Sequence, residues 1–278
     1  MSVLAQRMPA ANGVVFQRYE YKYVIPPDLM EPIRSFLRPY CDMDRYAARE
    51  DEKFYTITSL YLDNVDFKTY WDKEAEVPNR FKLRVRTYGR HAEGPVKFEI
   101  KRRFNEVSRK TWLEVPRDIW PALFRLPLDG EALALSAKQR SALEDFLGLA
   151  GIMRAEPKML VRYERQAFIS RIDRYVRISF DRRLRYQRCD RYGLKGEPFR
   201  WSNNDGTDST DESGSRVILE LKFMNSAPVW LVDLVRTFGL MRRGFSKYCT
   251  AVTLSLGANR TGCALDLAIP AAGVRMRR

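Results

Sequence analysis

Three cations alternate with apolar residues in the segment Phe-Lys-Leu-Arg-Val-Arg at 81–86. A period of two is typical of a β-strand, so we expect Lys82, Arg84 and Arg86 to share one face of a sheet. Side chains two residues apart on a strand lie about 6.6–7 Å from each other, and buried like charges without partners are costly. Such a row faces either water or a strongly anionic ligand. The chemistry that it suits is the binding of a polyanion.

Four further segments show the same alternation, and each combines cations with one carboxylate on a single face. The charged faces carry Arg18, Glu20 and Lys22; Lys97, Glu99 and Lys101; Arg177, Ser179 and Asp181; and Glu220 and Lys222. Solvated outer faces of an ordinary antiparallel sheet would explain any one segment. Their recurrence favours a sheet closed into a barrel with its charged faces turned inward. We therefore predict an α+β protein, an antiparallel β-barrel with a basic interior and helices packed outside. A polyanion would fill the lumen, and isolated carboxylates would hold a divalent cation.

Composition supports an anionic partner. The chain has 278 residues, of which 45% are hydrophobic, enough for a sizeable core, and a formal net charge of +14. This excess indicates nucleic acid, an anionic membrane surface or phosphate-rich small molecules. The single histidine, His91, lies in an expected hairpin turn, which excludes histidine-rich metal sites and Ser-His-Asp or Cys-His catalysis. The sequence contains neither a P-loop nor a dinucleotide-binding fingerprint.

The location is predicted from what the sequence lacks. Its four cysteines form no Cys-x-x-Cys pair, which argues against a thiolate zinc site and a disulfide framework. The first residues have no apolar signal-peptide core, and no apolar run approaches the ~18 residues that span a bilayer. We expect a cytoplasmic protein without a transmembrane segment.

The chain is expected to form one domain at 15–256, between a flexible leader at 1–14 and a tail at 257–278. Strands are predicted at 16–25, 54–63, 109–115, 158–169, 175–186, 216–224 and 245–256, with a hairpin over 81–103. Helices are predicted at 29–38, where Asp28 would be the N-cap, within 117–149, where Ser136 begins a helix that Gly148 and Gly151 close, and from Pro228 to about 241. The polar, acidic segment 201–215 is predicted to be a loop, either a lid or, in the favoured interpretation, an inert insertion.

Several of these segments match the motifs of a known family in the same order. They are Tyr-Glu-Tyr-Lys-Tyr at 19–23, Ser-Leu-Tyr-Leu-Asp at 59–63, Lys-Leu-Arg-Val-Arg at 82–86, Phe-Glu-Ile-Lys at 98–101, Tyr-Glu-Arg-Gln-Ala-Phe at 163–168, Val-Arg-Ile-Ser-Phe-Asp at 176–181, Leu-Glu-Leu-Lys-Phe at 219–223 and Phe-Ser-Lys-Tyr at 245–248. Through them the chain resembles the VTC (vacuolar transporter chaperone) domain, the polyphosphate-polymerase branch of the CYTH-like triphosphate tunnel metalloenzymes. The resemblance covers about 16–256 and implies a β-tunnel with helices packed outside.

The resemblance also implies roles for individual residues. Phosphate ligands lining the tunnel would be Lys22, Arg84, Arg86, Lys101, Arg165 and Arg177, joined by the pair Ser246 and Lys247; alternation of the strands adds Lys82 and Lys222. Lys247, Arg84 and Arg177 are the predicted catalytic residues. Glu220 resembles the ligand of a divalent metal, Mn²⁺ or Mg²⁺, and Glu99 is the next candidate.

Two positions do not follow simply from the family motifs. Related tunnel hydrolases begin with Glu-x-Glu-x-Lys, but here Arg18 replaces the first carboxylate, which leaves the role of Glu20 open. On a regular strand Arg165 and Tyr163 share one face. Arg162 then points outward and needs a partner there, or water.

The leading functional hypothesis is a metal-dependent polyphosphate polymerase that transfers the γ-phosphate of ATP onto a growing chain. Phosphoryl transfer requires positioning and charge neutralisation, and a chain end is already an oxyanion, so histidine is not needed. Hydrolysis of triphosphate or polyphosphate in the same tunnel is the enzymatic alternative, with Glu20, Glu99 and Asp181 as candidates to orient water. A non-catalytic polyphosphate-binding module is a third hypothesis. Nucleic acid is disfavoured, because Phe81 lies opposite the cations of its strand. The acceptor, the preferred metal and the oligomeric state stay open.

Overall fold

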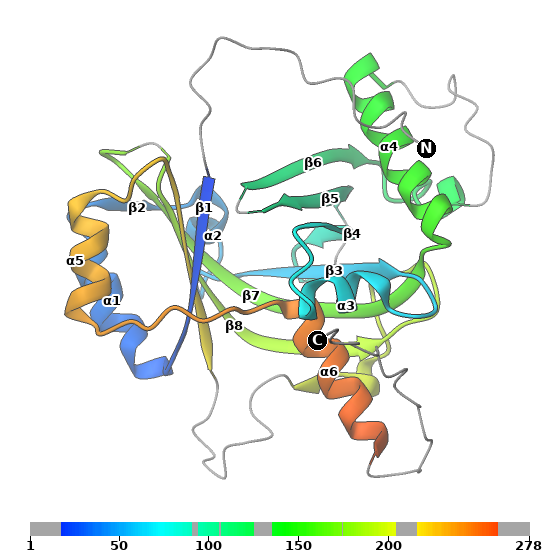
Figure 1. Ribbon diagram of the computed structural model, residues 1–278. Coiled ribbons are helices and arrows are strands. Elements are labelled where there is room, and N and C mark those ends of the chain that lie inside the picture. Colours follow the sequence, from blue (N-terminus) through cyan, green and yellow to red (C-terminus); the bar gives the residue numbers. More distant parts are fainter. Residues whose placement is uncertain are drawn as a thin grey trace, which may run out of the picture.

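The computed structural model describes residues 18–90, 94–105, 107–124, 135–173, 175–203 and 216–260. In these residues the protein is α+β, and its strands form a large antiparallel sheet (Figure 1). The 10 strands are β1 (Arg18–Ile25), β2 (Cys41–Met43), β3 (Tyr55–Asp63), β4 (Asn79–Tyr88), β5 (Val96–Phe104), β6 (Val107–Val115), β7 (Glu156–Ser170), β8 (Arg177–Arg188), β9 (Ser202–Asn203) and β10 (Val217–Met224). The main path runs β1-β10-β8-β7-β3-β4-β5-β6, with β2 paired to β7 and β9 to β8.

The sheet curls so that its two ends approach each other. Strands β1 and β6 are the ends of the main path, yet some of their Cα atoms come within 8 Å of each other. The Lys101 ammonium on β5 reaches a carboxylate oxygen of Glu20 on β1 at 3.0 Å. Side chains on the concave side can therefore contact one another across the sheet as well as along it.

Helices cover the outer face of the sheet in two places. Helix α1 (Met30–Leu37) and helix α5 (Val229–Thr237) pack on β1, β8 and β10, and α4 (Ala137–Met153) packs on β3, β4 and β5 (Figure 1). The buried contacts on the first side include Ile33, Leu37, Ile178, Phe180, Leu219, Leu221 and Leu234. Those on the second side include Leu60, Leu83, Val85, Phe98, Ile100, Leu143 and Phe146. These apolar residues alternate with the charged ones along each strand, as the sequence predicts.

The remaining helices are α2 (Arg45–Arg49), α3 (Lys68–Glu74) and α6 (Lys247–Arg260), and short 3-10 turns lie at Pro27–Leu29, Ala122–Phe124 and Pro198–Arg200. Helices α3 and α6 lie side by side, and the Tyr70 and Thr253 hydroxyls are 3.0 Å apart. Helix α6 packs against the inner face, by which we mean the face that carries Arg84. Its Tyr248 ring stacks on Tyr61 of β3 at 5.0 Å.

The prediction of a strand at 245–256 is wrong, because this segment forms α6. Ser246 precedes the helix, and its hydroxyl accepts a hydrogen bond from the Cys249 amide at 3.3 Å. The buried residues Tyr248, Ala251, Val252 and Ser255 follow the spacing i, i+3, i+4 and i+7, which brings one helical face to the sheet. The β-branched residues of the segment had favoured a strand.

Helix ends differ from the predictions in three places. Asp28 lies within the 3-10 turn that precedes α1, and no side chain caps that turn or α1. Ser136 and Gln139 form the expected capping box at the start of α4, but the helix continues past Gly148 and Gly151 to Met153. Helix α5 ends at Thr237, four residues before the predicted end.

Some predictions fall outside the described residues. They concern the leader at 1–14, His91, most of the acidic segment at 201–215 and the tail beyond 260. Of the acidic segment, Ser202–Asn203 is strand β9, paired with β8.

Candidate functional site

The basic row of β4 lies on the inner face. Leu83 and Val85 are 0% exposed in the core beneath α4, so the residues that alternate with them point to the other side of the sheet. Arg84 and Arg86 are largely buried there, and each faces β3 directly, Arg84 opposite Tyr61 and Arg86 opposite Ser59. Burial of this row requires partners. The inner face carries two groups of carboxylates, and the first of them contacts Arg84 and Arg86.

The first group is centred on Glu99 of β5, whose side chain is 1% exposed. It accepts hydrogen bonds from Arg84 and from Lys110, and a guanidinium nitrogen of Arg86 lies 3.9 Å away. Burial alone would raise the pKa of Glu99, but these cations, Arg84 foremost, hold it well below the usual range. Glu99 is therefore a fixed anion that neutralises part of the row.

Lys110 is a site residue that the sequence analysis missed. It lies on β6 opposite Lys101, and burial lowers the pKa of its ammonium to about 8, although Glu99 opposes this shift. A signal was present in the sequence, because Leu113 and Val115 are apolar and the residues alternating with them must face the other side. The adjacent cation Arg109 obscured that reading.

The second group is centred on Glu220 of β10, whose side chain is 5% exposed. Four cations surround it: Lys222 at 2.9 Å, Lys247 and Arg165 at 3.1 Å, and Lys22 at 3.7 Å. Burial acts to raise the pKa of Glu220, yet the cations, Lys222 foremost, hold it well below the usual range. These residues come from β1, β7, β10 and α6, so the site combines nearby strands of the sheet with the start of the last described helix.

Asp181 of β8 extends the second group. Both of its oxygens accept hydrogen bonds from Arg165, at 2.6 and 2.7 Å, and the Lys247 ammonium lies 2.5 Å away. Burial alone would lower the pKa of Lys247, but Asp181 and Glu220 raise it above the usual range. Lys247 is therefore a permanent cation at the first turn of α6, between two carboxylates.

Arg162 and Glu164 resolve the conflict that alternation leaves on β7. Both side chains lie on the outer face, as predicted if Arg165 points inward. Arg162 donates hydrogen bonds to the Thr58 hydroxyl at 3.1 Å and to the Lys195 carbonyl at 2.8 Å. Glu164 accepts from Arg182 at 2.9 Å.

The sequence of the chain matches the model of a known protein family. The model of the VTC domain matches residues 17–256, which include every residue of both groups. The chain belongs to the VTC domain family. A search of curated proteins finds no match.

Two solved structures are similar to this VTC domain at low identity. One is a candidate adenylate cyclase from Bacillus halodurans, with 12% identity, a TM-score of 0.44, and coverage of 83% of this chain and 95% of that one. The other is a protein from Pyrococcus horikoshii OT3, with 10% identity, a TM-score of 0.42, and coverage of 86% and 99%. None of the helices that the structure describes is both long and apolar enough to cross a bilayer.

The VTC domain has carboxylates that fit a divalent cation, at Glu20 and Glu220. Both converge on one ammonium, that of Lys22, at 3.3 and 3.7 Å. Lys22 thus occupies a cation position between two oxygen ligands, and Mg²⁺ in phosphoryl-transfer sites commonly takes one or two carboxylates plus phosphate oxygens. A cluster of three or more metal-ligating side chains is not found in the described part of the chain, so phosphate and water would complete the shell. Glu99 shares none of its cations with another carboxylate in the described contacts, which favours Glu220.

Helix α6 of the VTC domain is fixed by Asp63, at the end of β3. Asp63 is 0% exposed and accepts hydrogen bonds from the Tyr248 hydroxyl at 2.7 Å and from the Thr69 hydroxyl at 2.7 Å. The ammonium of Lys82 donates to the Ser246 hydroxyl at 3.0 Å and to the Cys249 thiol at 2.8 Å. Ser246, which directly precedes helix α6, is thus in contact with Lys82 of the basic row.

Arg177 is set apart from the other predicted residues. It is exposed at the start of β8, opposite Lys222 in register, and within the described part of the chain no ion pair joins it to Glu99 or Glu220. Lys101 is placed as predicted, with its ammonium 3.0 Å from Glu20. The other predicted phosphate-binding cations all lie on the inner face: Lys22, Lys82, Arg84, Arg86, Lys101, Arg165, Lys222 and Lys247.

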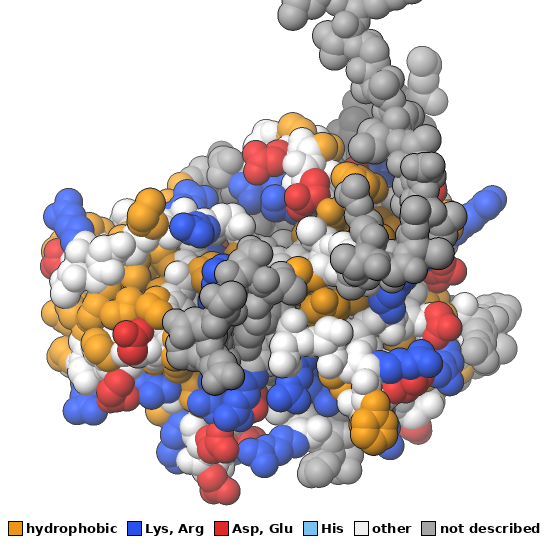
Figure 2. Space-filling model, turned by 90° about the horizontal axis from the view of Figure 1, so that it is seen from below, with side chains coloured by type: hydrophobic (Ala, Val, Ile, Leu, Met, Phe, Trp, Pro, Cys, Tyr) orange, Lys and Arg blue, Asp and Glu red, His pale blue; other side chains and the backbone are white. Residues whose placement is uncertain are grey.

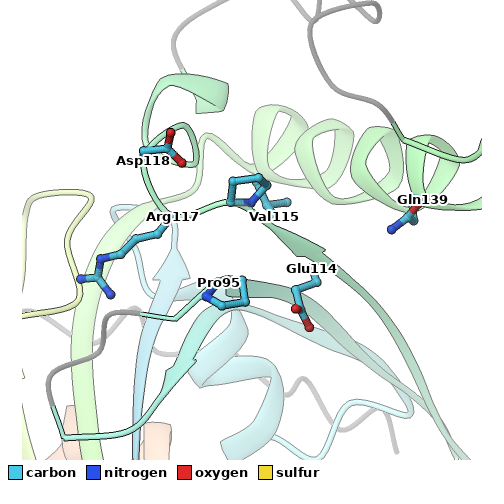
Figure 3. A pocket seen from close by; sticks show the side chains of 7 residues that line it. Pro95, Glu114, Val115, Arg117, Asp118 and Gln139 are labelled. Atoms are coloured by element: carbon cyan, nitrogen blue, oxygen red, sulfur yellow. The ribbon is translucent and has the colours of Figure 1, made fainter.

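A hollow among the described residues outside the two groups has a different character. A hollow at the edge of the sheet, beside the first turn of α4, is lined by Pro95, Glu114, Val115, Pro116, Arg117, Asp118 and Gln139 (Figure 3). It contains one cation and two carboxylates, so it does not suit a polyanion. Figure 2 shows Lys and Arg interspersed with Asp and Glu on the face seen from below, and hydrophobic side chains gathered on the side of α1 and α5.

Proposed function

We propose that this VTC domain is a metal-dependent polyphosphate polymerase, in which a sheet closed into a tunnel transfers the γ-phosphate of ATP onto a growing polyphosphate chain. The observation that carries the proposal is the excess of cations over carboxylates on the inner face. Glu20, Glu99, Asp181 and Glu220 are contacted by Lys22, Lys101, Lys110, Lys222, Lys247, Arg84, Arg86 and Arg165. Lys82 adds a half-buried cation without a carboxylate partner in the described contacts. Such an excess is costly unless a polyanion neutralises it.

The residues have distinct roles in the proposed reaction. Lys82, Arg84 and Arg86 form a row along β4, and they would hold the phosphates of the substrate in line. Lys247 would neutralise the charge that develops on the transferred group. Because its pKa is raised, it stays an ammonium and does not act as a base.

Glu20 and Glu220 would hold a divalent metal, which would supply positive charge against the substrate phosphates. Lys22, which lies between these carboxylates, would turn toward phosphate when the metal binds. Lys101 and Lys222 hold the outer oxygens of the same carboxylates at 3.0 and 2.9 Å and would keep them oriented.

Transfer is favoured over hydrolysis by the state of the carboxylates. Hydrolysis is assisted by a carboxylate that orients or deprotonates water, and its pKa should lie near the working pH. Burial alone would raise the pKa of Glu20 and of Asp181. Nearby cations outweigh this effect and hold both pKa values below the usual range, with Lys101 the strongest cation for Glu20 and Arg165 for Asp181. Weakly basic carboxylates of this kind suit a nucleophile that is already anionic, as the end of a polyphosphate chain is.

The test is to incubate purified protein with ATP and Mn²⁺ or Mg²⁺ and to resolve the products. The proposal expects ADP and long polyphosphate in step, and a decrease of two or more orders of magnitude in Lys247→Ala. Lys195→Ala, an exposed lysine outside the inner face, should keep wild-type activity. Release of free phosphate without chains would establish the hydrolase alternative, and no turnover together with tight tripolyphosphate binding would establish a binding module.

A further inference from the structure

Four aromatic side chains form a continuous arc at one end of the inner face. The aromatic arc consists of Tyr46 on α2, Tyr55 on β3, Tyr88 on β4 and Trp112 on β6. The Tyr46 and Tyr55 rings are 6.2 Å apart, and the Tyr55 and Tyr88 rings 6.3 Å apart. The Lys97 ammonium lies between the last two members, 5.2 Å from the Tyr88 ring and 4.9 Å from the Trp112 ring.

The arc adjoins the phosphate-binding cations. Tyr88 follows Arg86 by two residues on β4, so both point to the inner face at a separation of about 7 Å along the strand. Tyr55 is directly opposite Arg165 in the pairing of β3 with β7. Aromatic faces and buried guanidinium groups therefore form one surface without an intervening element.

The arc is at the end of this surface that α6 leaves open. At the other end of the β4 row, Lys82 is held by Ser246 and Cys249 of the α6 turn. The members of the arc, by contrast, are accessible: Trp112 is 53% exposed, Tyr46 49% and Tyr88 36%. Among the described residues, this end therefore offers exposed aromatic faces to a bulky planar group attached to a triphosphate.

Single exposed aromatic residues are common and need no function. This arc differs because its members come from four elements: the rings of Tyr46, Tyr55 and Tyr88 follow one another in series, and the Lys97 ammonium links Tyr88 to Trp112. Aromatic faces bordered by cations are the usual platform for stacking nucleobases, and the stacking tolerates different bases because every base has a π-face.

We propose that the aromatic arc binds the nucleobase of a nucleoside triphosphate whose phosphates extend past Arg86 and Arg165 toward Lys247. The inference rests on the proposed function, because it deepens the description of the same site. It gives the substrate a direction: the base stays at the open end, and the γ-phosphate is innermost. It also predicts weak discrimination between bases, since stacking carries most of the recognition.

The test compares the affinities of ATP and of inorganic tripolyphosphate, measured by calorimetric titration without turnover. We expect Trp112→Ala and Tyr88→Ala to weaken ATP binding about tenfold or more and to leave tripolyphosphate binding unchanged. Tyr46→Ala, on a short surface helix, should act in the same direction without affecting the sheet. Phe199→Ala, a fully exposed aromatic residue on another element, is the matched control and should change neither affinity.

Two results would overturn the inference: unchanged ATP affinity in the three arc variants, or parallel losses for ATP and tripolyphosphate. The outcome is separate from that of the proposed function. If the wild type builds no polyphosphate but the arc variants lose ATP affinity alone, the base site stands and the polymerase proposal fails. If chains form normally and the arc variants bind ATP like the wild type, the polymerase proposal stands and the base site fails.

Discussion

Neutralising Glu220 should destabilise the protein, preserve phosphate binding and abolish turnover. In Glu220→Gln the shape of the side chain is kept, but the four surrounding cations lose their common anion. Arg165 and Lys247 remain paired with Asp181, while Lys22 and Lys222, with side chains 19% and 36% exposed, can turn toward water. Removing one partner of a buried ion pair costs about 3–5 kcal/mol, and these remaining contacts place the expected loss near ~3 kcal/mol.

The measurement is thermal unfolding at pH 7 with and without tripolyphosphate, in buffer containing a chelator. For a domain of this size a loss of ~3 kcal/mol lowers Tm by about 6–12 °C. Because the pKa of Glu220 is lowered in the folded state, its contribution is fully present above the unfolded value of about 4.3 and is lost as the pH falls below it. The difference in Tm between wild type and variant should therefore shrink in acid.

Ligand binding and activity should change in opposite directions. Tripolyphosphate without metal should bind at least as tightly to Glu220→Gln, because one competing carboxylate is gone, and it should restore much of the lost Tm. Chain synthesis should fall below detection, because a metal ligand is missing. Glu197→Gln removes a surface carboxylate paired with Arg191 and Arg200 at 2.8 Å each, and it should change stability by no more than ~1 kcal/mol. Wild-type Tm and full turnover in Glu220→Gln would refute both the electrostatic reasoning and the metal assignment.

Three further changes are predicted. Arg84→Ala should weaken tripolyphosphate binding at least tenfold, and it should also lower Tm because Glu99 loses its main partner. An unchanged affinity in a titration would mean that this face of β4 is solvated and binds no phosphate. Lys110 has a pKa of about 8, so it loses its charge as the pH rises from 7 to 9, and polyphosphate affinity should fall over this range in the wild type but stay flat in Lys110→Gln. Asp63→Asn should lower Tm through loss of the charged acceptor of the Tyr248 hydroxyl, and circular dichroism should report unaltered strand content; a Tm equal to that of the wild type would contradict the anchoring role of Asp63.

The sequence predicts those parts of the site that lie on regular strands. Alternation at 81–86 suffices to put Leu83 and Val85 in the outer core and Arg84 and Arg86 on the other face, because a strand has only two faces. The same argument gives the inward position of Arg165 and the outward position of Arg162. It cannot give the contacts between strands, since the approach of Lys101 to Glu20 depends on how far the sheet curls.

The parts that were not predicted have physical reasons. Residues 245–256 are rich in β-branched and apolar side chains, and only burial of Tyr248, Ala251, Val252 and Ser255 on one side reveals the helical period. Tertiary contacts decide the structure of such a segment, here the stacking of Tyr248 on Tyr61 and its hydrogen bond to Asp63. The role of Arg177 as a phosphate ligand, which the family resemblance implies, stays a prediction; its side chain lies at the exposed start of β8.

The fixed carboxylates of the inner face have a consequence for the kinds of anion that can enter. Each carboxylate already forms ion pairs with two or more cations, as Glu220 does with Lys222 at 2.9 Å and with Lys247 at 3.1 Å. A monovalent anion would have to displace a tethered carboxylate at each cation it visits, whereas a phosphate polymer exchanges several contacts in a single entry and is held at many points. We therefore expect the inner face to select anions by the number of contacts that they can make at once. Chloride at cellular concentrations should not bind there, and the residence time of a phosphate polymer should increase steeply with the number of linked phosphates.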